Sequence, residues 1–286
     1  MKTRTLLVLS LAALLLAEAR GGLAVGTWWW DGRLAVSPDE STRRLDFLSA
    51  HGVTEIYLCL PHDVPEADVA KFIRAAAAKR IRVAYLSGDV SWIEPGSLGF
   101  DEIFAHYMRY QRSAPEDARF FALHLDVEPH QNTKLPDERK WQLYADFVAR
   151  AAARVHRAGE KIEWDIPFWL DDFKVWRGEQ QDASLLELLM DVSDGVTLMS
   201  YRDTASAVLD VGKNEIALAK GRKCRVLLGT ETGQTSEGNH VSFYEEGKAV
   251  LDKELGKIKK ALVGEMIPGG SGVAVHHVGS WMSLKD

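Results

Sequence analysis

The chain has 286 residues and a formal net charge of -6, with 46% hydrophobic and 27% charged residues. This composition excludes a disordered chain and is sufficient for one large domain with its own core. The acidic balance argues against a nucleic-acid backbone as the main partner, because such a partner needs a basic surface; an uncharged partner is easier to accommodate.

The first 19 residues have the pattern of a secretory signal peptide. Lys2 and Arg4 supply the positive charges, Leu6 to Leu16 form the apolar stretch, and Ala17-Glu18-Ala19 is a small-x-small cleavage site. The apolar stretch is shorter than the roughly 18 residues of a membrane span, so a retained membrane anchor is the less favoured alternative. We therefore expect a secreted or periplasmic mature protein that begins near residue 20 and does not insert into the membrane.

Strands and helices alternate along the rest of the chain. Apolar runs bounded by turn residues predict eight strands, and helical spacing of apolar residues predicts seven helices between them. The expected strands are 23–30, 54–61, 81–87, 120–128, 161–169, 194–203, 224–231 and 272–278. The expected helices are 41–51, 65–80, 101–112, 137–157, 184–192, 205–220 and 242–262.

This count and length predict a single α/β domain, a (β/α)8 TIM barrel over residues 20–286. A doubly wound open sheet is the alternative, but Trp28-Trp29-Trp30 stands where a dinucleotide fingerprint would have glycines. Because the chain stops soon after the eighth strand, we expect the closing eighth helix to be absent. Cys59 and Cys224 lie in strands far apart in the barrel order, so we expect two free thiols.

Residues 120–130 carry the strongest functional signal. His124, Asp126 and Glu128 stand at alternate positions at the end of the fourth strand, so the pleat directs all three to one side. Ionisable groups at the end of an apolar strand are costly to bury unless they are hydrogen-bonded or used, which indicates a catalytic cleft. The alternative is a structural carboxylate pair that fixes the surrounding loops.

The other strand ends are also polar and aromatic, and a barrel carries its active site at those ends. Two carboxylates on opposed strands, with indole rings that stack on sugar faces, are the combination that glycoside hydrolysis requires. We expect Glu128 to be the acid/base and Glu231 to be its best partner, with roughly half of the nine tryptophans in the core. The expected substrate-binding residues are Trp28, Trp30, Asp165, Trp169, Tyr201, Asp203, His276 and Trp281.

Two motifs carry a family resemblance. Leu125-Asp126-Val127-Glu128 resembles the end of the DxxDxDxE signature of the chitinase-like family 18 glycoside hydrolases, and Leu198-Met199-Ser200-Tyr201 resembles their MxY motif on strand six. Trp281 falls where that family has a tryptophan after strand eight. The resemblance implies that Glu128 is the general acid, that Asp126 orients the acetamido group of the substrate as internal nucleophile, and that Tyr201 hydrogen-bonds that group.

The sequence also departs from the family pattern. His124 and Phe121 stand where the signature has Asp, and Arg202 follows Tyr201 where the family usually has Asp. Glutamates at the ends of strands four and seven are also the plan of the large retaining glycosidase clan, although Val127 stands where that clan has Asn. We therefore expect a distant barrel of the glycoside-hydrolase type.

Three functions remain open at this point. The leading one is an exported glycoside hydrolase in which Glu128 works with Glu231 or with an Asp126-assisted substrate group. The second is a non-catalytic glycan-binding barrel that uses the same tryptophans. The third is a metal-dependent hydrolase, but the HxH and HExxH spacings are missing, so we expect neither a metal nor another cofactor. Its ligands would be His124, Asp126, Glu128, His130 and either His276 or His277.

Overall fold

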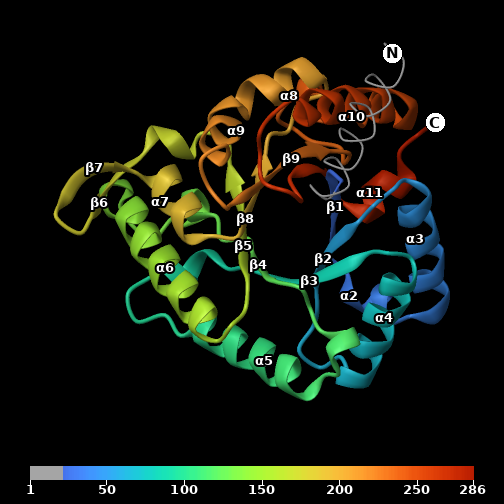
Figure 1. The fold of residues 1–286 in the computed structure, drawn as a ribbon, viewed down its shortest axis with the longest axis horizontal. Coiled ribbons are helices and arrows are strands. Elements are labelled where there is room, and N and C mark those ends of the chain that lie inside the picture. Colours follow the sequence, from blue (N-terminus) through green and yellow to red (C-terminus); the bar gives the residue numbers. More distant parts are fainter. Residues whose placement is uncertain (1–21) are drawn as a thin grey trace, which may run out of the picture.

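A computed structural model describes residues 22–286; the expected signal peptide at residues 1–19 lies outside this range. Eight parallel strands close into a barrel, and each strand pairs with its sequence neighbours among the barrel strands (Figure 1). These strands are β1 (Ala24–Trp29), β2 (Glu55–Cys59), β3 (Arg82–Ser87), β4 (Leu123–Leu125), β5 (Ile162–Pro167), β8 (Gly195–Met199), β9 (Arg225–Glu231) and β10 (Gly272–His276). The predicted TIM barrel is confirmed.

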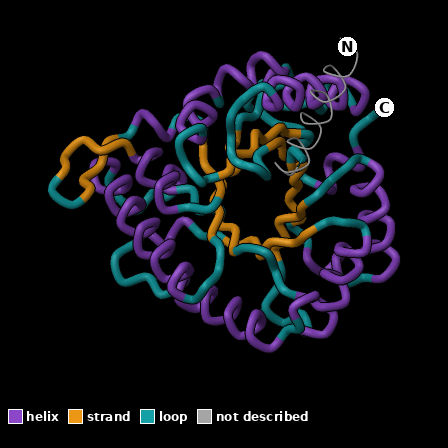
Figure 2. Tube along the Cα trace, in the orientation of Figure 1, coloured by secondary structure: helices purple, strands orange, loops and turns teal. Residues whose placement is uncertain are grey.

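Helices form a layer around the ring of strands, as Figure 2 shows. They are α2 (Gly32–Ala35), α3 (Pro38–Ala50), α4 (Glu66–Ala78), α5 (Gly99–Ser113), α6 (Asp137–Arg157), α7 (Leu185–Val192), α8 (Ala205–Val211), α9 (Lys213–Ala219), α10 (Lys248–Val263) and α11 (Val278–Ser283). Short 3-10 turns are η1 (Val90–Ile93), η2 (Glu116–Ala118), η3 (Pro129–Gln131), η4 (Leu170–Asp172) and η5 (Asn239–Val241). A closing helix is therefore present in shortened form, as the six residues of α11, where we expected none.

The helix α6 shows why these segments fold as they do. Pro136 precedes it, acidic residues occupy its first turn and basic residues its last, which matches the helix dipole. Its buried residues recur at helical spacing and include Tyr144, Phe147, Val148, Ala151 and Val155. This apolar stripe packs the helix against the barrel, where each large side chain contributes roughly 1.5–3 kcal/mol of transfer free energy.

Several elements differ from the prediction. The fourth strand ends at Leu125 rather than at Glu128, because Pro129 starts the turn η3 directly afterwards. The expected helix 205–220 is divided into α8 and α9 at Gly212, and α10 begins only after Gly247, which has a positive φ. A small antiparallel hairpin, β6 (Lys174–Arg177) and β7 (Gln180–Ser184), was not predicted; it projects at the left of Figure 1.

The core consists of two apolar layers. Inside the barrel, Trp28 and Tyr57 pack edge to face at 5.3 Å, and alanines on the other strands leave room for their rings. The larger layer lies between strands and helices. Five of the nine tryptophans are buried, in agreement with the expected half; they are Trp28, Trp29, Trp92, Trp164 and Trp281.

A buried ion network fills the opposite, amino-terminal end of the barrel. Arg225 donates to Glu163 Oε1 at 2.7 Å and to Glu55 Oε1 at 2.8 Å. Arg82 donates to Glu55 Oε2 at 2.7 Å, and the Tyr57 hydroxyl donates to Glu55 Oε1 at 2.9 Å. Each buried charge in this layer therefore has a partner of opposite sign, as burial requires.

Cys59 and Cys224 are both free thiols, as predicted. Cys224 is buried and Cys59 is half-buried, and burial raises the pKa of each.

Over residues 22–286, no helix combines the length and the apolar character that a membrane crossing needs.

Candidate active site

A cavity of about 330 Å³ opens at the carboxyl ends of the barrel strands. The ends of β1, β5, β8 and β10 and the segments that follow β4 and β9 form its wall. The lining residues are Trp28, Trp30, Asp126, Glu128, His130, Gln131, Asp165, Pro167, Phe168, Trp169, Met199, Tyr201, Arg202, Glu237, Val241 and His276. Of the eleven residues predicted for the site, eight lie on this wall.

The floor of the cavity is held by Asp165. Its Oδ1 lies 2.9 Å from His124 Nε2, and its Oδ2 accepts a hydrogen bond from Trp28 Nε1 at 2.8 Å. His124 is fully buried and stacks on the Tyr57 ring at 3.9 Å between centroids. Because both oxygens of Asp165 have protein partners, this carboxylate fixes the floor.

The pairing of His124 favours its charged form. Burial alone lowers the pKa of His124, but the charges and hydrogen bonds of Asp165 and Glu163 outweigh burial and raise the pKa to about 9. Its Nδ1 lies 3.6 Å from Glu163 Oε2. An imidazolium at this position therefore balances two carboxylates inside the barrel.

Asp126 stands next to this pair and has the opposite character. Burial, followed by the negative charges of Asp165 and Glu128, raises the pKa of Asp126 well above its usual range. Its Oδ1 is buried without a hydrogen-bond partner among the residues that the structure describes. The backbone of Asp126 packs so closely on Gly88 that a Cβ at position 88 would collide with its carbonyl. Asp126 is thus a firmly placed carboxyl group with an unused oxygen, and its surroundings favour the protonated form.

Glu128 lies higher on the wall and is more open, with 24% of its side chain exposed. Its Oε2 is 3.1 Å from His130 Nε2, and the His130 ring meets the edge of Trp169 at 5.1 Å. Although the strand ends early, His124 faces the barrel interior while Asp126 and Glu128 line the cavity above it. The predicted common direction of the three side chains is confirmed.

His276 on the wall and Glu231 behind it form a second pair. Trp30 Nε1 can only donate, so His276 Nε2 accepts from it at 3.0 Å, and the proton on His276 Nδ1 points to Glu231 Oε2 at 2.7 Å. Burial alone would raise the pKa of Glu231, but the hydrogen bonds from His276 and from the amides of Gly233 and Thr232 outweigh burial and lower it. Glu231 therefore positions His276 and, through it, the Trp30 ring.

Three predicted site residues do not line the cavity. Both oxygens of Glu231 are engaged as described above, since Oε1 accepts from two backbone amides. The backbone amide of Asp203 donates to the His240 carbonyl, and its side chain is not on the wall. Trp281 is 1% exposed and packs against Phe47 of α3 and against His51, which follows that helix, in the outer apolar layer. Trp281 was predicted to bind substrate, but in this position it cannot reach the cavity.

The wall also contains residues that the sequence analysis did not assign to the site. Arg202 and Phe168 lie together, with the guanidinium 4.9 Å from the centre of the ring. Glu237 enters from the loop after β9. The charge of Arg202 next to Tyr201 was a visible signal, whereas Glu237 lies six residues beyond a strand and had none.

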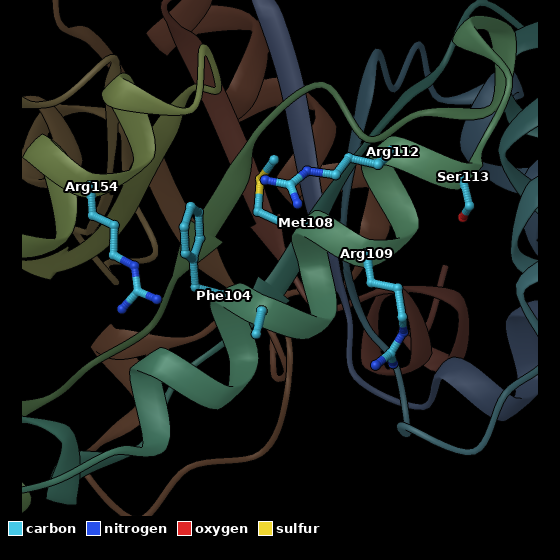
Figure 3. Close-up of a pocket in the computed structure, with 7 residues that line it drawn as sticks. Phe104, Met108, Arg109, Arg112, Ser113 and Arg154 are labelled. Carbon is cyan, nitrogen blue, oxygen red and sulfur yellow. The ribbon is translucent and has the colours of Figure 1, made fainter.

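A larger hollow of about 610 Å³ lies elsewhere, over the outer surface of α5 and α6 (Figure 3). Its wall combines the apolar Phe104 and Met108 with the cations Arg109, Arg112 and Arg154. General acid catalysis usually uses a carboxyl group or a histidine, and neither lines this hollow. We therefore place the candidate site at the barrel mouth.

Between residues 22 and 286, no three His, Cys, Asp or Glu side chains are grouped as metal ligands.

The protonated state of His124 makes stability depend on pH in a defined direction. Because its pKa in the folded state is about 9, above the ordinary value of about 6.5, the native protein holds a proton that the unfolded chain releases as the pH rises. The free energy of unfolding should therefore be highest below pH 6.5 and fall by at most roughly 3 kcal/mol through pH 9. Urea unfolding at several pH values across this range measures the change in the free energy of unfolding.

The variant His124→Gln should remove most of this slope. His156→Gln is the matched control, because His156 is 44% exposed beside Asp194. A wild-type curve that stays flat between pH 6.5 and 9 would contradict the assigned charge.

Comparisons with known proteins agree with the fold. No protein-family model and no curated protein sequence matches this chain. The catalytic domain of a mannanase from Streptomyces sp. SirexAA-E aligns with a TM-score of 0.53 at 15% identity, covering 89% of this chain and 74% of that one. The C-terminal domain of a proposed chitinase from Desulfitobacterium hafniense DCB-2 aligns with a TM-score of 0.52 at 11% identity, covering 77% and 71%. The chain shares the barrel fold of these glycosidase structures, as the resemblance in its sequence predicted.

Proposed function

We propose that this protein is an exported glycoside hydrolase whose acid/base is Glu128. The observation that carries the proposal is that Glu128 and Asp126 open on one cavity whose wall also bears three tryptophans. Export rests on the signal-peptide pattern of residues 1–19. Sugar rings are bound by such aromatic faces, and glycosidic bonds are broken by such carboxyl pairs.

Glu128 is suited to the acid role by its place. It lies on the wall with 24% of its side chain exposed, so a glycosidic oxygen in the cavity can reach it. In its protonated form it donates to the leaving oxygen, and the resulting carboxylate then accepts a proton from water. His130, 3.1 Å from Glu128, is placed to stabilise that carboxylate after the bond has broken.

Asp126 is the partner that we assign to Glu128, in place of Glu231. Its unpartnered Oδ1 is free to hydrogen-bond the substrate, whereas both oxygens of Glu231 bind protein groups. The family resemblance implies that the bound group is a sugar acetamido group that acts as internal nucleophile. Tyr201 supplies a second donor, because burial, and next the charge of Glu231, raises its pKa and keeps the hydroxyl neutral.

The aromatic residues divide into floor and rim. Trp28 is 1% exposed and is fixed by Asp165, so it forms the floor under a bound sugar. Trp30 is 37% exposed, and Trp169 is half-buried beside Trp141 and His130. These two rings are the stacking surfaces that we assign to the sugars on either side of the cleaved bond.

A screen of oligosaccharides with and without N-acetyl groups tests the proposal. We expect hydrolysis of N-acetylated substrates only, with retention of the anomeric configuration as an internal nucleophile requires, and NMR of the first product reports that configuration. Inversion would contradict the role of Asp126. Binding of glycans without any hydrolysis would instead support the non-catalytic alternative.

A further inference from the structure

Arg202 is an unusual component of the cavity wall. Its Nη1 donates to the Tyr201 carbonyl at 2.7 Å, and its guanidinium lies over the Phe168 ring at 4.9 Å. These two contacts fix the side chain without neutralising it. No carboxylate within residues 22–286 forms an ion pair with Arg202, although the guanidinium is half-buried.

The other charged groups of the wall are already accounted for. Asp165 pairs with His124, Glu128 pairs with His130, and His276 donates to Glu231. Burial raises the pKa of Asp126 and so favours its uncharged form. The one further carboxylate on the wall is the exposed Glu237, and it forms no ion pair with a cation in the described part of the chain. Arg202 is thus the wall cation that lacks an acidic partner.

We propose that the cavity is built for an acidic glycan, and that Arg202 binds a carboxylate on one of its sugars; this deepens the glycosidase function proposed above and rests on it. A guanidinium presents its N–H groups in a planar fork that matches a carboxylate, and such charge-assisted pairs are stronger than neutral hydrogen bonds. The chain as a whole carries a charge of -6, so the attraction is local to Arg202 and does not come from the overall field.

Binding of matched tetrasaccharides tests this proposal. Three tetrasaccharides that all contain N-acetylglucosamine are compared. The first contains only N-acetylglucosamine and is neutral. In the second, N-acetylglucosamine alternates with its 3-O-lactyl derivative, and in the third it alternates with glucuronate. Each acidic ligand is compared with its carboxyl-reduced form, by calorimetry in the Glu128→Gln protein so that the ligand stays intact. We expect at least one acidic ligand to bind roughly tenfold or more tightly than its reduced form, by an amount that shrinks with salt. The two acidic ligands distinguish a lactyl carboxylate from a uronate.

The variants separate Arg202 from general electrostatics. Arg202→Gln should abolish the preference for the acidic ligand, and Arg202→Lys should restore only part of it, because an ammonium lacks the planar fork. Arg157→Gln is the matched control, since this exposed arginine ends α6 at the opposite end of the barrel, and it should leave the preference intact. Glu237→Gln should preserve or increase the preference.

The outcomes also separate this inference from the proposed function. If no acidic ligand exceeds its reduced form, or if Arg202→Gln keeps the preference, the acidic-glycan assignment is wrong even where wild-type protein hydrolyses the neutral ligand. If acidic ligands bind through Arg202 but wild-type protein cleaves none of them, the assignment stands and the hydrolase function fails. Affinity for the neutral homopolymer verifies that each variant is folded.

Discussion

Replacing Glu128 by glutamine is expected to lower hydrolysis of the cleaved glycan roughly a thousandfold while glycan binding and folding persist. Glutamine keeps the shape of the side chain and its access to the cavity but cannot transfer a proton to the leaving oxygen. Glu128 is partly exposed and its one ion pair is with His130, which is itself 33% exposed, so little stability depends on it. The loss should therefore appear in kcat and not in the free energy of unfolding.

The size of the loss should depend on the leaving group. A substrate with an activated aryl leaving group needs little protonation, so Glu128→Gln should be impaired far less on it than on an oligosaccharide. Glu116→Gln is the matched control, because Glu116 is exposed at η2 on the outside of the barrel. Oligosaccharide turnover by Glu128→Gln within a few-fold of wild type would refute the acid role.

The fold could be predicted from local patterns because apolar residues recur along the sequence with the periodicity of strands and helices. The apolar runs located all eight barrel strands, and the boundaries of α6 agree with the predicted 137–157. The hairpin β6–β7 was missed because its residues are mostly polar and it depends on a distant contact. Gln142 of α6 binds both the backbone amide and the carbonyl of Trp176 on β6. Local sequence carries no sign of such a contact.

The candidate site could be predicted only as far as strand order determines it. Asp126, Glu128 and Asp165 follow strand ends and therefore reach the barrel mouth. Glu231 also ends a strand, but the amides of the two residues after it turn back onto its carboxylate and withdraw it from the cavity. Trp281 lies on α11, whose docking on α3 is a tertiary contact. Strand order identifies the edge where a side chain emerges, and the loop that follows decides where it points.

Replacing Arg225 by methionine is expected to destabilise the protein by roughly 3–5 kcal/mol at neutral pH. The side chain is only 8% exposed, and it joins the carboxylates of Glu163 and Glu55, which are 3% and 0% exposed. Methionine fills similar space but leaves Glu163 buried without its strongest partner, and desolvation of an unpaired charge is costly. Urea unfolding followed by circular dichroism measures the change.

Arg222→Met is the matched control for this loss. Arg222 pairs with Glu187 and Asp191, which are 51% and 29% exposed, so water can replace the lost contacts and the cost should stay near 1 kcal/mol or less. The deficit of Arg225→Met should also shrink in acid. Burial alone raises the pKa of Glu163, but Arg225, together with His124, outweighs burial and lowers it in the native protein. Wild type therefore loses stability as the pH falls below the ordinary pKa of a glutamate. Without Arg225, burial dominates, the pKa of Glu163 rises, and protonation relieves the buried charge. Equal losses of stability for the two variants, or a deficit of Arg225→Met that grows toward low pH, would contradict the claim that Arg225 stabilises the buried carboxylate of Glu163.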